Sequence, residues 1–258
     1  MKIGFFDSGL GGLTILKAVT KELPEYDYEF YGDTANLPYG DKSEEEIFEL
    51  TKAGVEFLFN KECSLVIIAC NTSSAETIKK LQTDFLPKEY PHKKVLGVII
   101  PTIEAVLDSS PKQITILSTK RTAESRKYEM EFLKLKCKVP NVSISTPRLV
   151  PLIEGGEMEE AHQNVFKIIN EQKVTDNVVL GCTHYTLLKS KLRDVYKGRG
   201  MRFFSQDEII PEKLKLYLEN HPEIKNELST NKIRNIFLTK HSSKYDQIIQ
   251  ELLDGKFI

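Results

Sequence analysis

Two cysteines, Cys70 and Cys182, each directly follow an apolar segment and precede a hydroxyl or amide side chain. The first segment reads LVIIACNT over residues 65–72, and the second reads VVLGCTH over residues 178–184. A free thiol has a pKa of about 8.5, so small changes in its surroundings can make it an acid or a base near neutral pH. Two thiols on opposite sides of one carbon could remove a proton from one face and deliver another to the opposite face. The pattern therefore predicts inversion of a stereocentre.

Both cysteines stand at predicted junctions between a strand and a helix, where amide N–H groups and the helix dipole favour a thiolate. Asp7 follows the apolar segment 2–6 in the same way. Ligands of open parallel sheets bind beyond the carboxyl ends of the strands, so we expect Asp7 to lie beside Cys70 if their strands are neighbours. His184, two residues after Cys182, is expected to serve the other thiol.

Other chemistries fit less of this pattern. Residues 9–14 imitate a dinucleotide-binding fingerprint, but threonine replaces its third glycine and Asp7 would lie close to the pyrophosphate. The histidine near the second cysteine lacks partners at metal-ligand spacing, so no metal is predicted. A hydrolase built on Cys182, His184 and Asp7 remains open but leaves Cys70 without a role. A ligand-binding module without catalysis also remains open.

The elements that must position these residues alternate between short segments rich in Val, Ile and Phe and longer segments of helical period. This alternation predicts an α/β fold with mostly parallel central sheets flanked by helices. The two cysteine motifs are separated by nearly half the chain, which indicates two similar lobes. The predicted strands are 2–6, 27–31, 64–69, 94–99, 113–117, 141–145, 177–181, 200–204 and 234–238.

Local signals predict where some helices and turns begin. Ser43 with Glu46, and Ser205 with Glu208, have the spacing of capping boxes, in which a hydroxyl and a carboxylate each satisfy a free backbone N–H. The sequence Pro-Tyr-Gly at 38–40 is typical of a turn. As a pocket loop, this turn could also present a backbone N–H and a phenol to a carboxylate.

The composition favours a small-molecule partner. The chain has 258 residues with 36 Lys and Arg against 37 Asp and Glu, and its net charge of −1 gives no attraction to nucleic acid or acidic membranes. No apolar run approaches the roughly 20 residues of a membrane-spanning helix, and the first residues are too few and too quickly acidic for a signal peptide, so we expect a cytoplasmic protein. The dispersed cysteines predict free thiols, and Cys63 and Cys137 are interpreted as small core residues.

Five segments together resemble glutamate racemase, the cofactor-independent enzyme that supplies D-glutamate for bacterial peptidoglycan. They extend from the start of the chain to about residue 190, whereas the last quarter of the chain is only loosely similar. The segments are FFDSGLGGLTILKA (5–18), YGDTANLPYG (31–40), VIIACNTSSA (66–75), LVPLIEGG (149–156) and LGCTHYTLL (180–188).

The resemblance implies that Cys70 and Cys182 exchange the α-proton of glutamate, with Cys70 facing D-glutamate and Cys182 facing L-glutamate. It further implies that Asp7 assists Cys70, and that His184 and Glu154 assist Cys182. Short hydroxyls, an amide and backbone N–H groups can bind carboxylates without adding charge to the site. The substrate-binding residues implied by the resemblance are Ser8, Tyr39, Gly40, Asn71, Thr72, Thr119, Thr122 and Thr183.

The resemblance also implies two α/β lobes related by a pseudo-two-fold axis, with the active site between them. The first lobe is expected to comprise residues 1–96 and 208–258, and the second residues 97–207. No cofactor and a homodimer are implied as well. A racemase or isomerase of the same superfamily that acts on aspartate or another small carboxylate is the alternative, because four positions depart from the family pattern. These positions are Asn36, Ile100, Ser118 and Thr186.

Overall fold

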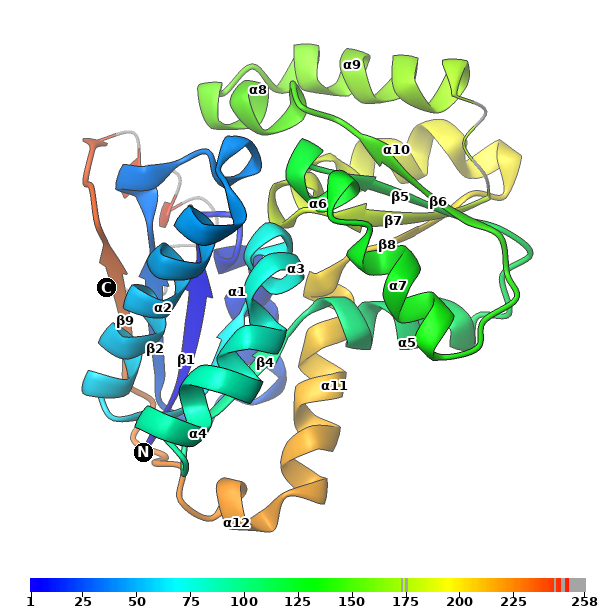
Figure 1. Cartoon of the computed structure of the whole chain (residues 1–258). Helices are drawn as coiled ribbons and strands as arrows, with labels where there is room; N and C mark the ends of the chain where they lie inside the picture. The colour runs from blue at the N-terminus through cyan, green and yellow to red at the C-terminus, as the bar shows by residue number, and fades with distance from the viewer. Residues whose placement is uncertain (173, 175, 244, 247–248, 251–258) are drawn as a thin grey trace.

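The strands form two parallel sheets in a computed structural model, which describes residues 1–172, 174, 176–243, 245–246 and 249–250 (Figure 1). The first sheet has the order β4–β3–β1–β2–β9, with β1 (Lys2–Asp7), β2 (Tyr28–Gly32), β3 (Cys63–Ile68), β4 (Lys94–Gly97) and β9 (Arg234–Leu238). The second has the order β6–β5–β7–β8, with β5 (Ile114–Ser118), β6 (Asn141–Ser145), β7 (Asn177–Gly181) and β8 (Arg202–Phe204). Every predicted strand is present, with ends shifted by at most two residues. The predicted α/β fold with parallel sheets is confirmed.

Helices cover both faces of the first sheet. Side chains of α1 (Leu13–Glu22) and α11 (Gln206–Asn220) join one core cluster, and side chains of α2 (Glu44–Asn60) join another. Successive residues of a strand point to opposite faces, so Phe5 of β1 enters the first cluster and Phe6 the second. The uninterrupted apolar character of the strands follows from this burial on both sides.

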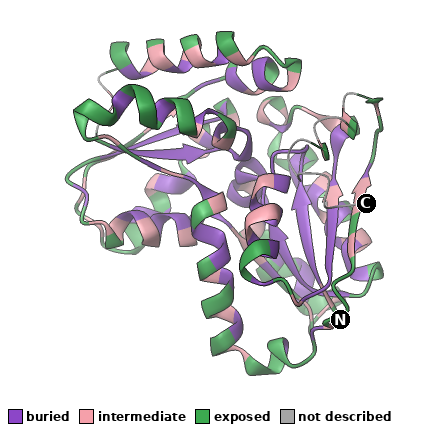
Figure 2. Cartoon of the chain, turned by 180° about the vertical axis from the view of Figure 1, so that it is seen from behind, coloured by how far each residue is buried: buried purple, intermediate pink, exposed green. Residues whose placement is uncertain are grey.

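The second sheet is covered in the same way. On one face lie α8 (Leu149–Gly155), α9 (Met158–Glu171) and α10 (Lys189–Tyr196), and on the other lie α5 (Ile99–Asp108) and α7 (Lys127–Lys134). Figure 2 shows both sheets buried and the helices with exposed outer faces. The remaining helical segments are α3 (Asn71–Lys80), α4 (Leu86–Glu89), α6 (Lys120–Glu124), α12 (Pro222–Lys225), the short helices η1 (Thr34–Asn36), η2 (Tyr39–Asp41), η4 (Thr183–Leu188) and η5 (Lys197–Arg199), and the π-helical turn η3 (Leu81–Phe85).

The chain passes between the two sheets twice. It leaves the first sheet after β4 and enters the second through α5, and it returns through α11 before β9 completes the first sheet (Figure 1). The exact division into lobes, with boundaries at residues 96/97 and 207/208, stays a prediction.

One of the two predicted capping boxes is present. Ser43 makes both hydrogen bonds of the box at the start of α2. The box at Ser205 is wrong, because its hydroxyl instead donates to Asp207 and accepts from the Lys189 ammonium at 2.9 Å. Glu208 is likewise bound by cationic side chains of α10. Charge-assisted hydrogen bonds thus take the groups that would have capped α11.

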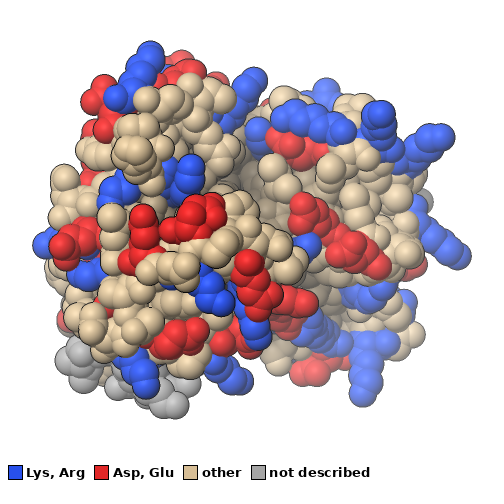
Figure 3. Space-filling view, turned by 90° about the horizontal axis from the view of Figure 1, so that it is seen from below, with Lys and Arg blue, Asp and Glu red and all other residues tan. Residues whose placement is uncertain are grey.

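The surface carries charges of both signs. In the face shown in Figure 3, Lys and Arg side chains are interspersed with Asp and Glu. Such a mixture produces no extended field of one sign on this face, as the balanced composition predicts. Over the described residues, none of the helices is both long and apolar enough to cross a membrane.

Candidate active site

Cys70 and Cys182 line one cavity of about 40 Å³ between the two sheets. Cys70 follows β3 and is the N-cap of α3, whereas Cys182 follows β7 and precedes η4. Because each cysteine stands beyond the carboxyl end of a parallel strand, the two sheets bring their edges, and with them the two sulfurs, to the same cavity. Both cysteines are buried.

Most of the predicted site residues line this cavity. Three lie outside the lining and form hydrogen bonds with residues within it: Asp7, Thr122 and Glu154. The predicted residues in the lining are Ser8, Tyr39, Gly40, Cys70, Asn71, Thr72, Thr119, Cys182, Thr183 and His184. Pro38 lines it as part of the predicted pocket loop, and the sequence analysis missed Leu37, Asp41, Lys120, Thr146, Pro147, Val150 and Pro151. Thr146 could have been found, since it directly follows a predicted strand like the other polar residues of the site.

The surroundings of Cys70 favour the protonated thiol. Burial raises the pKa of Cys70, and the charge of Asp7 raises it further. Hydrogen bonds oppose these effects: the Ser73 N–H donates to the sulfur at 3.5 Å, and the Ser8 hydroxyl lies 3.3 Å from it. The pKa is raised on balance, so the expectation of a thiolate at this helix start is not met. Loss of hydration outweighs the amide and dipole contributions.

Asp7 lies at the end of β1, which pairs with β3 as predicted. Its carboxylate is fully buried, and this burial raises its pKa despite the opposing charge of His184 and two backbone N–H groups. Gly9 donates its N–H to one carboxylate oxygen at 3.1 Å, and Thr183 donates its hydroxyl to the other at 3.4 Å. Asp7 therefore lies among groups from both sheets, and its burial favours the protonated carboxyl group.

Cys182 is served by a relay of two side chains. Its sulfur lies 3.7 Å from Nδ1 of His184, whose Nε2 lies 2.5 Å from Oε1 of Glu154 on α8. Burial opposes the charged imidazole, but the contacts with Cys182 and Glu154 outweigh it and raise the pKa of His184 well above its ordinary value. The histidine is therefore an imidazolium that can stabilise negative charge on the neighbouring sulfur.

Three threonine hydroxyls form a closed triangle across the two sheets. Thr72 at the start of α3 lies 2.9 Å from Thr119 and 3.1 Å from Thr122, which are 3.0 Å apart. A cavity of about 40 Å³ has room for roughly three water molecules. These hydroxyls can also bond to a ligand, because Thr72 and Thr119 both line the cavity.

The Pro-Tyr-Gly segment lines the cavity, but its phenol is already used. The Tyr39 hydroxyl donates to Asp33 at 2.6 Å, and the same carboxylate accepts hydrogen bonds from Asn36 and Thr239. Thr239 follows β9, so the last strand of the first sheet holds this loop in place. The segment can thus offer its backbone to a ligand, whereas the phenol fixes the loop. Asn36, which departs from the family pattern, takes part in the same network.

The glycine-rich segment after β1 allows a close approach between groups of the two sheets. A Cβ atom on Gly11 would lie 2.4 Å from the Thr183 hydroxyl and 2.9 Å from the backbone nitrogen of His184. Any side chain at this position would displace the segment that follows Cys182. This contact requires a glycine at position 11. Gly11 is one of the residues that make the segment similar to a dinucleotide-binding fingerprint.

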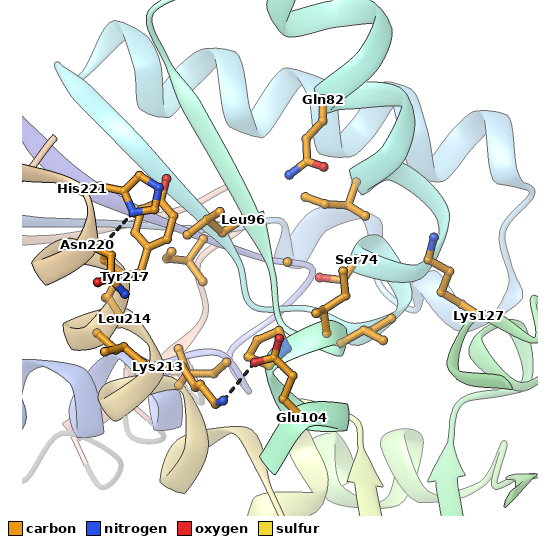
Figure 4. A pocket seen from close by; sticks show the side chains of 18 residues that line it. Ser74, Gln82, Leu96, Glu104, Lys127, Lys213, Leu214, Tyr217, Asn220 and His221 are labelled. Atoms are coloured by element: carbon orange, nitrogen blue, oxygen red, sulfur yellow. Dashed lines mark hydrogen bonds and ion pairs between the residues drawn. The ribbon is translucent and has the colours of Figure 1, made fainter. Parts of the chain in front are cut away.

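A larger cavity of about 350 Å³ lies between α3, β4, α5 and α11 (Figure 4). Aliphatic side chains form about half of its lining, and they include the half-exposed Ile100. Lys213 and Glu104 form an ion pair of 2.9 Å across it. Among the described residues that line it there is no cysteine. The two cysteines of the predicted proton transfer lie in the smaller cavity.

Known proteins share both the sequence and the fold. The family model for Asp/Glu/Hydantoin racemases matches residues 14–203. The glutamate racemase of Ruegeria pomeroyi is 37% identical over 240 residues, which cover 87% of this chain and 88% of that protein.

Two solved structures extend the likeness to almost the whole chain. A glutamate racemase isoform of Bacillus anthracis has a TM-score of 0.86 at 29% identity and covers 98% of this chain and 94% of its own. The glutamate racemase of Francisella tularensis, solved in complex with D-glutamate, has a TM-score of 0.84 at 25% identity and covers 100% of this chain and 95% of its own. With its two-cysteine cavity and these matches, the chain belongs to the Asp/Glu/Hydantoin racemase family.

Proposed function

We propose that this protein is a glutamate racemase, an isomerase that interconverts L- and D-glutamate by proton transfer between two thiols, without a cofactor. The observation that carries the proposal is that Cys70 and Cys182 share one cavity, each with its own proton-handling partner. Family relatives named glutamate racemase cover most of the chain and support glutamate as the substrate.

The direction from L- to D-glutamate begins with a thiolate at Cys182 and a thiol at Cys70. The imidazolium of His184 stabilises Cys182 as a thiolate, which removes the α-proton of L-glutamate. Cys70, whose pKa burial raises, holds a proton and delivers it to the opposite face of the carbon. The turnover ends with a thiol at Cys182 and a thiolate at Cys70, and this is the form that accepts D-glutamate in the reverse reaction.

Return to the starting form requires one proton to reach Cys70 and another to leave Cys182. Asp7 is suited to the first step, because burial raises its pKa and so favours the protonated carboxyl group that can act as the donor. The second proton leaves Cys182 for solvent once the product has gone, and the positive charge of His184, which is bound to Glu154, favours this loss. These three residues are therefore proposed as partners of the two thiols.

The substrate is held by neutral donors. Hydroxyl, amide and backbone N–H groups bind carboxylates without a fixed positive charge. Such a charge would strengthen binding of the substrate as much as binding of the transition state. We assign this role to Ser8, Tyr39, Gly40, Asn71, Thr72, Thr119, Thr122 and Thr183. For Tyr39 the assignment concerns the backbone, since its phenol is bound to Asp33.

In the cell, D-glutamate made by this reaction supplies peptidoglycan synthesis, and thus cell wall biogenesis and the maintenance of cell shape. We propose a cytoplasmic homodimer, in keeping with the family. We also propose that residues 1–96 with 208–258, and residues 97–207, form the two lobes that separate to admit substrate.

Three alternatives lead to different outcomes. An aspartate racemase of the same superfamily would use the same thiols on a shorter substrate. A cysteine hydrolase would need Asp7 to orient His184, but Nε2 of His184 is bound to Glu154. A binding module would hold glutamate without exchanging its α-hydrogen.

The test is loss of the α-hydrogen of L- and D-glutamate in deuterium oxide, followed by NMR, with circular dichroism for racemisation. The wild-type protein is expected to exchange and racemise glutamate and to leave aspartate unchanged. Cys70→Ala and Cys182→Ala should each reduce racemisation by roughly 10²- to 10⁴-fold, the usual contribution of a positioned acid or base. Cys137→Ala is the matched control, because this half-buried cysteine lies outside the cavity.

Full racemase activity in either cavity variant would contradict the two-thiol mechanism. Exchange with aspartate alone would indicate the other substrate. Tight glutamate binding by calorimetry without any exchange would indicate a binding module.

A further inference from the structure

Asn71 is the first residue of α3 and lines the cavity next to Cys70. Its side chain is buried, and its carbonyl oxygen accepts a hydrogen bond of 2.7 Å from the hydroxyl of Tyr128. Tyr128 is fully buried on α7, which belongs to the second sheet, whereas α3 follows a strand of the first (Figure 1). The hydrogen bond therefore joins groups from the two sides of the cavity.

This contact determines which end of the amide is available. An amide has an acceptor and a donor end that differ little in shape, so its orientation depends on its partners. Tyr128 occupies the acceptor end. Within the part of the chain that the structure describes, the donor end, Nδ2, is buried without any hydrogen-bond partner. A buried N–H group without an acceptor is unfavourable, which indicates that a ligand supplies the acceptor.

We propose that Tyr128 is a positioning residue that holds the Asn71 amide with its N–H groups towards a carboxylate of the substrate. The inference rests on the proposed function, since glutamate supplies the carboxylate. Asn71 would otherwise be free to present its carbonyl oxygen, which repels a carboxylate. Because the two residues come from opposite sides of the cavity, the amide is oriented only when the sheets are closed over the substrate. Tyr128 thus links closure to recognition of the carboxylate.

The phenol is suited to this role over a wide pH range. Burial raises the pKa of Tyr128 far above its ordinary value, and the charge of nearby Cys182 raises it further. The hydroxyl therefore keeps its proton and remains a hydrogen-bond donor.

The test is a double-mutant cycle of Tyr128→Phe and Asn71→Ala, with glutamate kinetics in both directions and glutamate Kd by calorimetry. Tyr128→Phe is expected to raise KM and Kd by roughly fivefold to tenfold, the effect of one hydrogen bond, with kcat near the wild-type value. In the Asn71→Ala background, Tyr128→Phe should have almost no further effect, because the amide that it orients is absent.

Tyr28→Phe is the matched control, since it also removes a fully buried hydroxyl, one that donates to the backbone of Leu23 at 2.7 Å. It should lower the melting temperature and leave KM unchanged. If the effects of Tyr128→Phe and Asn71→Ala on KM and Kd multiplied, or if Tyr128→Phe left both unchanged, the positioning role would be overturned. A wild-type protein that exchanges no α-hydrogen would refute the proposed function instead, and the cycle measured by Kd would still decide the role of Tyr128.

Discussion

Replacement of Glu154 by Gln isolates the charge that acts on His184. Gln keeps the size of the side chain and can still bond Nε2, which lies 2.5 Å from Oε1 of Glu154. The side chain of Glu154 is 18% exposed and that of His184 is 6% exposed, so solvent screens their interaction weakly. Burial lowers the pKa of His184, and the contacts with Cys182 and Glu154 raise it. Loss of the carboxylate should therefore lower this pKa.

The size of the effect follows from the hydrogen bond. A bond to a charged group contributes about 1.5–3 kcal/mol, and a bond between neutral groups about 0.5–1.5 kcal/mol. The midpoints of these ranges differ by about 1.25 kcal/mol, which corresponds to about one pKa unit. The imidazolium exists below its pKa, so Glu154→Gln should move the alkaline limb of kcat/KM to lower pH by about one unit. The loss of activity is then small in acid and approaches about tenfold in alkali.

The assay is the initial rate of racemisation by circular dichroism in both directions, from about pH 6 to about pH 9.5, the range in which His and Cys titrate. The two enantiomers have equal free energies, so kcat/KM must fall equally in both directions, which provides an internal check. Glu157→Gln, an exposed glutamate three residues further on, is the control and should leave the profile unchanged. An unshifted alkaline limb in Glu154→Gln, or a loss of equal size at every pH, would refute the relay.

Two further predictions concern contacts between the sheets. Arg121→Met removes a 2.7 Å ion pair with Glu76 and leaves the Glu76 carboxylate, which is only 5% exposed, without this partner. The free energy of unfolding in urea should therefore fall by about 2 kcal/mol. An unchanged unfolding midpoint would contradict this. Gly11→Ala places a Cβ 2.4 Å from Thr183 Oγ1 and should lower kcat/KM by at least about tenfold. Gly198→Ala, which meets open space, is its control; equal kinetics in the two variants would show that the close approach is unimportant.

The sequence predicted most of the fold because its signals are local. Strands covered on both faces are continuous apolar segments, and each of them was found within two residues of its place. The predicted capping box at Ser205 is absent because of a residue that is not local in the sequence. Lys189, 16 residues earlier in the chain, binds the hydroxyl that the box required. Local spacing contains no information about such a competitor.

The candidate site was predictable to the extent that it depends on the ends of strands. Parallel strands of one sheet end at one edge, so Asp7 at the end of β1 and Cys70 after β3 could be expected to meet there. Cys182 follows β7 of the other sheet, and its place opposite Cys70 depends on how the two sheets pack. The contacts among these site residues could not be predicted. The sequence does not show which of several similar polar residues become neighbours in the folded protein. The hydroxyl of Tyr128, 57 residues from Asn71, has no signal in the sequence pattern.

The sequence by itself determined the α/β fold, the two cysteine motifs and the chemistry that two thiols can perform. Only the tertiary structure decided that burial raises the pKa of Cys70, that contacts with Cys182 and Glu154 raise the pKa of His184, and that the amide of Asn71 is held by a tyrosine. Periodicity and motif spacing are properties of neighbouring residues along the chain. Protonation and side-chain orientation depend instead on burial and on partners that only folding brings near.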